Sequence, residues 1–337
     1  MAVHENHADH VGAEFDRERA EVTAAAEAEP ALSFLAHYRR GVYDFGVDRL
    51  AEPEASALRD RLRLLGRQFC HLTMRLDRIL AEARTGGLIR VVLHGGNAAA
   101  FCDAVVPDAH LFGLALTLGA DEADELQPIL TEQHAVRSAD QAVAMLATRL
   151  RALAQLPTAN PGGWETTGRA GRQAAAEDSG ETVTEIRHRT ADKLPDGELA
   201  FARDSLREYI RAPDLHFVAF CANCEPVLTF DRLADPVLGP YFQQITIPAR
   251  RAFYHRLSRE VGDVAARFNR TAADVVGGLL DRLVLDVEQG AVYYYRLGAG
   301  RFLMGVTLNQ DEVSTVDDRM AELARRFRPV GVGSREK

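Results

Sequence analysis

Long apolar runs are missing from this chain of 337 residues, and cysteine is scarce. No segment stays apolar over the length that a membrane-spanning helix needs, so we expect no membrane span. The polar residues 1–16, rich in histidine and acids, do not resemble a secretory signal. The cysteines are too dispersed for a disulfide framework, which predicts a protein of the reducing cytoplasm. They are Cys70, Cys102, Cys221 and Cys224.

An excess of positive charge is also missing. The chain has 40 Lys and Arg residues against 49 Asp and Glu, a formal net charge of −9. This balance disfavours nucleic acid or an anionic membrane as the main partner. Hydrophobic residues make up 47% of the sequence, which is sufficient for folded cores.

The motifs of common catalytic sites are missing too. We find no phosphate-binding glycine-rich loop with lysine, no nucleophile elbow and no His-Glu-x-x-His segment. Gly298-Ala299-Gly300 lacks the third glycine that a dinucleotide-binding turn needs. We therefore expect no enzyme, no catalytic residue and no cofactor-binding residue.

Candidate metal ligands are few. Cys221 and Cys224 lie three positions apart at a predicted hairpin tip, where two cysteines can hold two corners of a zinc site. Cys70-His71 would supply the other ligands only if the two segments meet. Because no second cysteine pair of this spacing exists, reduced cysteines without metal are the expectation. We also expect solvated side chains at His4, His7 and His10.

Two further local features have simple explanations. The run Tyr293-Tyr294-Tyr295, followed by Arg296, suggests base stacking, but in a strand these rings alternate between faces and at least one belongs to a core. The N-x-T triplet at Asn269 has no role as a glycosylation site in a protein that is not secreted.

Composition divides the chain into five segments. Residues 1–30 indicate a flexible acidic arm that is able to form a helix over 16–28, and residues 331–337 indicate a tail. Residues 156–195 are rich in glycine, proline, threonine and alanine, which is typical of a linker. The linker separates a first module, residues 31–155, from a second module, residues 196–330.

The two modules resemble each other in sequence. Residues 88–118 align with 280–310 without a gap and share eight identities in 31 positions, where chance gives about two. The identities include Val92/Val284 and Gly113/Gly305. Upstream, the sequence from Asp48 to Pro53 matches that from Asp231 to Pro236 at a shift that is nine smaller, so we expect an insertion near 239–247. We therefore expect an internal duplication.

The second module shows the predicted element order α-β-β-α-β-β-β-α, and the first fits the same plan less cleanly. In the second, the pattern predicts a helix over 204–211, strands over 215–221 and 226–230, a long helix after Pro248, strands over 283–287, 291–297 and 302–308, and a helix after Ser314. In the first, it predicts strands over 32–38 and 42–47, a helix over 53–83, strands over 88–93, 98–104 and 111–116, and a helix over 138–153 after an additional segment, 121–137.

This order, with a β-hairpin before a long helix and a closing trio of strands and a helix, resembles the roadblock/dynein light-chain family. The likeness is carried by 215–327, notably Phe217-Val218-Ala219-Phe220 and the strand from Arg301 to Leu308. It implies an α/β (α+β) fold of two roadblock- or profilin-like modules, each a five-stranded antiparallel sheet with a long helix and flanking helices. GAF and PAS sensor folds share much of this order.

The resemblance also implies how the modules assemble. Modules of the family pair sheet edge to sheet edge and pack their long helices together, either as a pseudo-dimer within one chain or as a homodimer. The apolar stripes of the two long helices are the candidate contact surface, although each stripe is equally suited to cover its own sheet. The candidate residues are Leu58, Leu62, Leu65, Phe69, Leu72, Leu76, Phe253, Leu257, Val261, Val264 and Phe268.

Three functions remain open from the sequence. The first is a non-catalytic regulator or scaffold that binds a partner protein, which the resemblance implies to be a small Ras-like GTPase. The second is a small-molecule sensor with a GAF- or PAS-like pocket. The third is structural self-assembly.

Overall fold

We describe a computed structural model of the chain. The structure describes residues 3–50, 55–96, 98–116, 127–157, 183–210, 214–276 and 278–327. The predicted tail, the first residues of the predicted helix over 53–83 and most of the predicted linker lie outside these residues.

The chain forms two compact units. The first contains Met1–Glu82, Gly86–Gly168 and Ala266–Glu288, and the second contains Ala83–Thr85, Arg169–Ala265 and Gln289–Lys337. The division does not follow the chain at one point, because the last part of the second long helix and the strand after it belong to the first unit.

The elements occur in one order, β-α-β-β-α-β-β-β-α, that is repeated once. The first set is β1 (His4–His7), α1 (Asp16–Ala28), β2 (Leu32–Arg39), β3 (Val42–Asp48), α2 (Ala55–Leu80), β4 (Leu88–Gly95), β5 (Ala98–Val106), β6 (Ala109–Leu116) and α3 (Gln127–Leu153). The second set is β7 (Thr184–Arg187), α4 (Asp196–Ile210), β8 (Phe217–Ala222), β9 (Glu225–Asp231), α5 (Ile247–Val276), β10 (Leu280–Val287), β11 (Gly290–Gly298), β12 (Arg301–Thr307) and α6 (Val313–Phe327). The expected mixed α/β class and all ten expected strands are confirmed.

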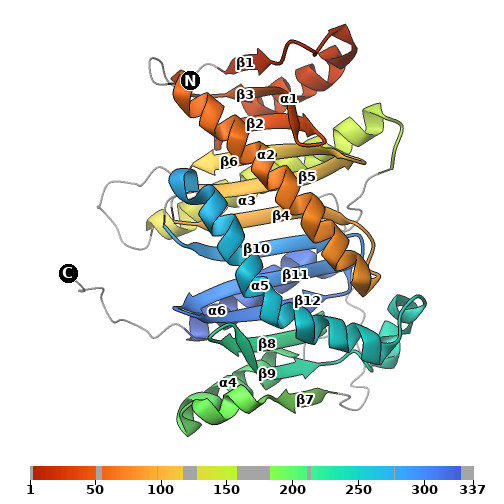
Figure 1. Cartoon of the computed structure of the whole chain (residues 1–337), viewed down its shortest axis with the longest axis vertical. Helices are drawn as coiled ribbons and strands as arrows, with labels where there is room; N and C mark the ends of the chain where they lie inside the picture. The colour runs from red at the N-terminus through yellow and green to blue at the C-terminus, as the bar shows by residue number, and fades with distance from the viewer. Residues whose placement is uncertain are drawn as a thin grey trace, which may run out of the picture. The chain divides into compact units, whose positions relative to one another are not determined.

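In the first unit the strands lie in the order β1-β3-β2-β6-β5-β4-β10, and all neighbours are antiparallel. The helix α2 crosses one face of these strands, while α1 and α3 lie on the other face (Figure 1). Both faces are therefore covered, which is why the strands are almost continuously apolar instead of alternating.

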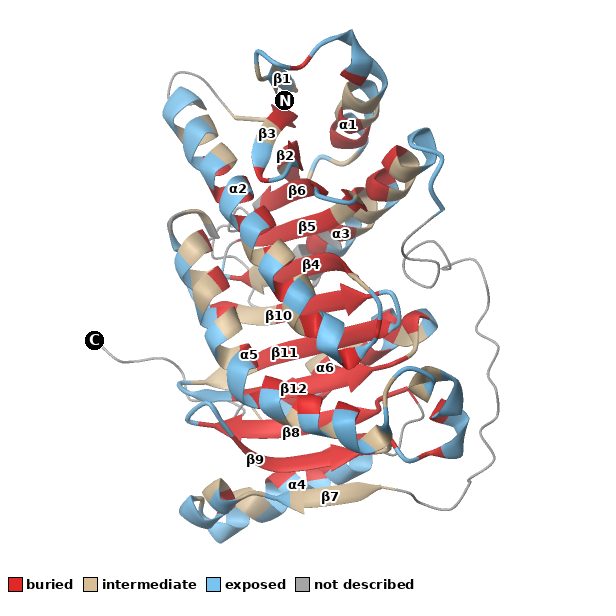
Figure 2. Ribbon diagram, turned by 45° about the vertical axis from the view of Figure 1, so that its right-hand side comes forward, coloured by how far each residue is buried: buried red, intermediate tan, exposed pale blue. Residues whose placement is uncertain are grey.

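In the second unit the order is β11-β12-β8-β9-β7, again antiparallel. The first part of α5 lies over one face, where Tyr254 packs on Phe217 with ring centroids 5.6 Å apart, and α4 and α6 contact the other face (Figure 1). The order β11-β12-β8-β9 repeats β5-β6-β2-β3 of the first unit. Figure 2 shows that the strands other than β1 and β7 are mostly buried, while the outer sides of α2 and α5 are exposed. None of the described helices is both long and apolar enough to cross a membrane.

The N-terminal residues differ from the expected flexible arm. The predicted helix over 16–28 is confirmed as α1, but Val22 is buried and Phe15 packs on Phe45 of β3. Ahead of it, β1 pairs with β3, and His10 bonds to Asp44 at 2.8 Å. The sequence did not predict this arrangement because α1 has few large apolar residues. Its buried residues are Val22 and two alanines, Ala25 and Ala26.

Three other boundaries differ from expectation. Residues 184–187 of the expected linker form β7, which pairs with β9, and α4 begins eight residues before the predicted helix. In the first set, α3 begins at Gln127, so most of the segment expected before Ser138 is helical. The predicted insertion near 239–247 is partly a 3-10 helix, Pro236–Phe242, which Asp235 caps through the Val237 N–H at 3.0 Å.

The identities between the sets have structural causes. Asp48 ends β3, accepts a hydrogen bond from the Leu50 N–H at 3.1 Å and binds Arg59 of α2 at 2.7 Å. Asp231 does the same at the end of β9, with the Leu233 N–H at 3.1 Å and Arg251 of α5 at 2.8 Å. These contacts fix where the hairpin stops and how the long helix starts.

A second repeated contact lies at the other end of each long helix. The side-chain oxygen of Asp77 accepts the Leu88 N–H at 2.7 Å, and that of Asn269 accepts the Leu280 N–H at 2.7 Å. Asn269 is thus a structural acceptor in this fold. Each contact joins the end of a long helix to the first residue of the strand that follows it.

Candidate functional site

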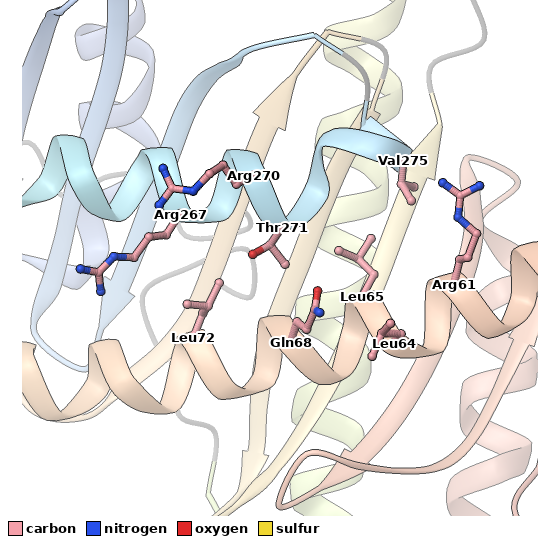
Figure 3. A pocket seen from close by; sticks show the side chains of 9 residues that line it. All are labelled: Arg61, Leu64, Leu65, Gln68, Leu72, Arg267, Arg270, Thr271 and Val275. Atoms are coloured by element: carbon pink, nitrogen blue, oxygen red, sulfur yellow. The ribbon is translucent and has the colours of Figure 1, made fainter.

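A surface groove lies between α2 and the last part of α5, and all its residues belong to the first unit. It has a volume of about 510 Å³. Its lining residues are Arg61, Leu64, Leu65, Gln68, Leu72, Arg267, Arg270, Thr271 and Val275. The two helices run antiparallel beside it, with leucines, Gln68 and Thr271 between them and the arginines toward the ends (Figure 3).

Helix periodicity places these residues. The α2 residues recur every three or four positions, and so do those of α5, which puts each set on one side of its helix. Leu65 is buried at the floor, whereas Leu64 is 54% exposed. Of the described lining residues three are arginines and none is a carboxylate, in a chain of net charge −9.

The eleven predicted interface residues are divided by the structure. Leu65 and Leu72 line the groove. Phe69 lies beneath it, with its ring centroid 5.1 Å from Phe268 of α5 and 5.1 Å from Phe112 of β6. The stripe of α2 therefore covers its own sheet and also contacts α5 at this point.

The remaining predicted residues do not reach the groove. Leu62, Leu76, Phe253, Leu257 and Val261 are buried, while Leu58 and Val264 are half-buried. Those of α5 from Phe253 to Val261 belong to the second unit, where the helix covers β8. That the eleven act as one surface stays a prediction.

The pairing of β4 with β10 is the second candidate site. These strands occupy equivalent places in the repeat, and both lie in the first unit. Their antiparallel register sets Val92 opposite Val284, the residue that the alignment makes its equivalent. The register therefore relates β4 and β10 by a local twofold axis that passes between Val92 and Val284.

A buried charge cluster spans this strand pair. Arg90 of β4 donates to Asp286 of β10 at 2.7 Å and to Asp140 of α3 at 3.2 Å, and Asp103 of β5 lies opposite it. All four side chains are buried. Burial lowers the pKa of Arg90, but the neighbouring carboxylates Asp140, Asp286 and Asp103 more than offset it, so the guanidinium stays charged. Burial raises the pKa of Asp103 well above its ordinary value, against the opposing effect of Arg90.

The cysteine pair of the hairpin tip is split between two environments. Cys221 is buried, with its sulfur 3.6 Å from the Ser258 carbonyl oxygen, and burial raises the pKa of its thiol well above the ordinary value. Cys224 is exposed, and it follows Asn223 in a turn where both residues have positive φ. Among the residues described, no group of three or more His, Cys, Asp or Glu could hold a metal ion.

The histidine and tyrosine candidates have structural partners. Asp44 accepts hydrogen bonds from His37 at 2.9 Å and from His10 at 2.8 Å. Burial alone would raise the pKa of Asp44, but these bonds lower it below its ordinary value. Tyr293 and Tyr295 donate to α6 backbone oxygens at 2.7 and 3.0 Å, so they hold that helix and are not exposed for base stacking.

Sequence reasoning missed most of the groove. The missed residues are Arg61, Leu64, Gln68, Arg267, Arg270, Thr271 and Val275. They lie beside the apolar stripes, where a polar residue ordinarily faces solvent. The one available signal was the recurrence of arginine along one side of each helix.

Comparisons with known proteins found only weak structural similarities. No model of a protein family matches the chain, and no curated protein matches it either. Among solved structures, the gliding protein MglB from Thermus thermophilus is 18% identical with a TM-score of 0.26, over 40% of this chain and 93% of that chain. A structure of MglB with a tetrameric arrangement is 19% identical with the same TM-score and coverage. At these TM-scores the likeness carries no argument about fold or function.

Proposed function

We propose that this chain is a non-catalytic regulatory or scaffold protein of the cytoplasm, built from two copies of a roadblock-like module. The copies pair within the molecule and present a surface to a partner protein. The observation that carries this proposal is the β4–β10 pairing, in which repeat-equivalent strands lie antiparallel with Val92 opposite Val284.

The repeated architecture supports the proposal. The nine-element order occurs twice, and the contacts of Asp48 recur at Asp231. A single module would leave one edge strand unpaired, and an exposed edge invites unwanted pairing with other chains. Pairing the edge strands of two modules covers both edges. Joining the copies in one chain raises their effective concentration.

The partner that the family resemblance implies is a small Ras-like GTPase. The sensor alternative needs an apolar cavity between a sheet and its long helix. The groove described above lies instead between two helices and carries arginines at its ends, which favours a protein partner.

The test is binding of the full chain to small Ras-like GTPases from the source genome, each loaded with GDP or with a non-hydrolysable GTP analogue. We expect at least one GTPase to bind, with affinity that depends on the nucleotide. Failure of every GTPase to bind, together with a rise in thermal stability in the presence of a metabolite, would move the assignment to a sensor.

A further inference from the structure

We propose that the groove between α2 and α5 binds an acidic amphipathic helix of the partner protein. This inference rests on the proposed function for the existence of a partner, and it names the element that the partner presents.

The shape of the groove favours a helix. On α2 the lining residues Arg61, Leu64, Leu65, Gln68 and Leu72 follow the helical repeat, and the facing α5 residues do likewise. Two helices lying side by side leave a linear depression, and a third helix fills it by setting its side-chain ridges into theirs.

The leucines of the groove call for apolar anchors, while Gln68 and Thr271 in its middle offer hydrogen-bonding groups (Figure 3). Leu64 is 54% exposed, and Leu72 and Val275 of the lining are half-buried. Leucine-sized side chains spaced three and four residues apart on a docked helix would cover this surface.

The charge of the groove determines which charge the ligand should carry. Arg267 and Arg270 lie toward one end and Arg61 toward the other, and the described lining residues include no carboxylate (Figure 3). Glutamate or aspartate on the docked helix would meet the guanidinium groups of Arg267 and Arg270. The described lining residues include no aromatic ring on which a base could stack, which argues against single-stranded nucleic acid.

The probe is a fluorescent peptide of about 18 residues with leucines at helical spacing and glutamates on both flanks. Its controls are the same peptide with lysine for glutamate, and a permuted peptide with the apolar face broken. We expect the acidic peptide alone to bind the full chain, with a Kd of about 10 μM, a gain of helical circular dichroism and weaker binding at high salt.

Variants locate the site. We expect Leu64→Asp and Arg267→Glu each to weaken peptide binding by about tenfold or more. The matched controls are Val42→Asp, at a residue 53% exposed, and Arg75→Glu, on α2 but outside the lining; both should leave binding unchanged. The thermal unfolding of each variant shows that it is folded.

The proposal is overturned if the lysine peptide binds as well as the acidic one, or if the control variants weaken binding as much as the groove variants. A GTPase that binds the full chain and is insensitive to Leu64→Asp and Arg267→Glu would remove the groove inference and leave the proposed function standing. If the peptide binds and no GTPase does, the groove inference stands and the proposed GTPase partner is removed.

Discussion

Asp48 and Asp231 show how one side chain can define a repeat. Each closes a hairpin through a backbone N–H two residues later, and each holds an arginine in the first half of a long helix. The two carboxylates are almost fully buried, with 2% side-chain exposure. A buried carboxylate that loses its cation is strongly unfavourable, so neither residue is free to vary alone.

Replacing either aspartate should therefore destabilise the protein. We expect Asp48→Ala and Asp231→Ala each to lower the free energy of unfolding by about 3 kcal/mol, because the partner arginine is left without its carboxylate. Urea unfolding measures the loss. A difference between the two of more than about 2 kcal/mol would contradict equivalent roles.

Gly290 lies at a position where the backbone conformation and a close contact both require glycine. It has a φ of +94°, and a Cβ there would lie 2.0 Å from the carbonyl oxygen of Thr307. We expect Gly290→Ala to lower the free energy of unfolding by about 2 kcal/mol or more. Gly298→Ala, at the other end of β11 with nothing within 4 Å, is the control and should change it by less than about 0.5 kcal/mol.

His110 makes stability depend on pH. Burial, with a smaller effect of nearby His37, lowers its pKa to about 4 against the opposing effects of Asp108 and Asp77. The unfolded chain has the ordinary value of about 6.5, so from there down to about pH 4 the unfolded state binds a proton that the folded state does not. Stability due to this group therefore falls as pH falls, by up to about 3 kcal/mol.

His110→Leu should keep the protein stable at pH 7 and make the loss of stability between pH 6.5 and 4 shallower by about one proton. The measurement is urea unfolding as a function of pH. An unchanged slope would show that this imidazole is not the titrating group. His255, whose pKa is also lowered to about 4 by burial, remains in the variant and accounts for part of the residual slope.

At the scale of elements, the strand pair β4–β10 combines apolar and ionic contacts. Val92 faces Val284 at its centre, and Arg90 faces Asp286 two positions away. The repeat-equivalent positions carry His94 and Arg282, so the ionic contact is not symmetric. In a self-pairing of β4 in the same register, Arg90 would face His94 and lose one of its carboxylates. The charge cluster therefore favours β10 as the neighbour of β4.

Breaking this cluster on one side should be costly. We expect Arg90→Met to lower the free energy of unfolding by about 3–5 kcal/mol, because Asp286 and Asp140 remain buried without the cation. Adding Asp286→Leu should recover a substantial part of the loss, since one uncompensated carboxylate is removed. A double variant no more stable than Arg90→Met would show that the two side chains are not coupled.

At the scale of the whole molecule, the repeat predicts the state of the protein in solution. Both edges of β4 are occupied, by β5 and by β10, so the strand has no edge left for a second chain. We expect a monomer of 37.1 kDa by light scattering. A stable dimer, with each chain exchanging its second copy, would contradict pairing within the molecule.

The sequence by itself determined the local elements. Hydrophobic periodicity and glycine placement predicted all ten of the expected strands and both long helices, because these signals depend on neighbours along the chain. Alignment of the sequence with itself predicted a duplication and an insertion of nine residues, and both stay predictions. The strands β1 and β7 were not predicted because a mostly polar segment of four residues becomes a strand only when a partner strand offers its edge.

Only the tertiary structure decided the rest. It paired β10 with β4, set Asp286 against Arg90 at a sequence separation of 196 and joined one side of α2 to one side of α5 as a groove. No local pattern carries this information, because long-range contacts depend on the shape and charge that distant segments present once they are folded. Leucines and arginines at these positions are ordinary on each helix alone. They form a groove only because the two helices lie side by side.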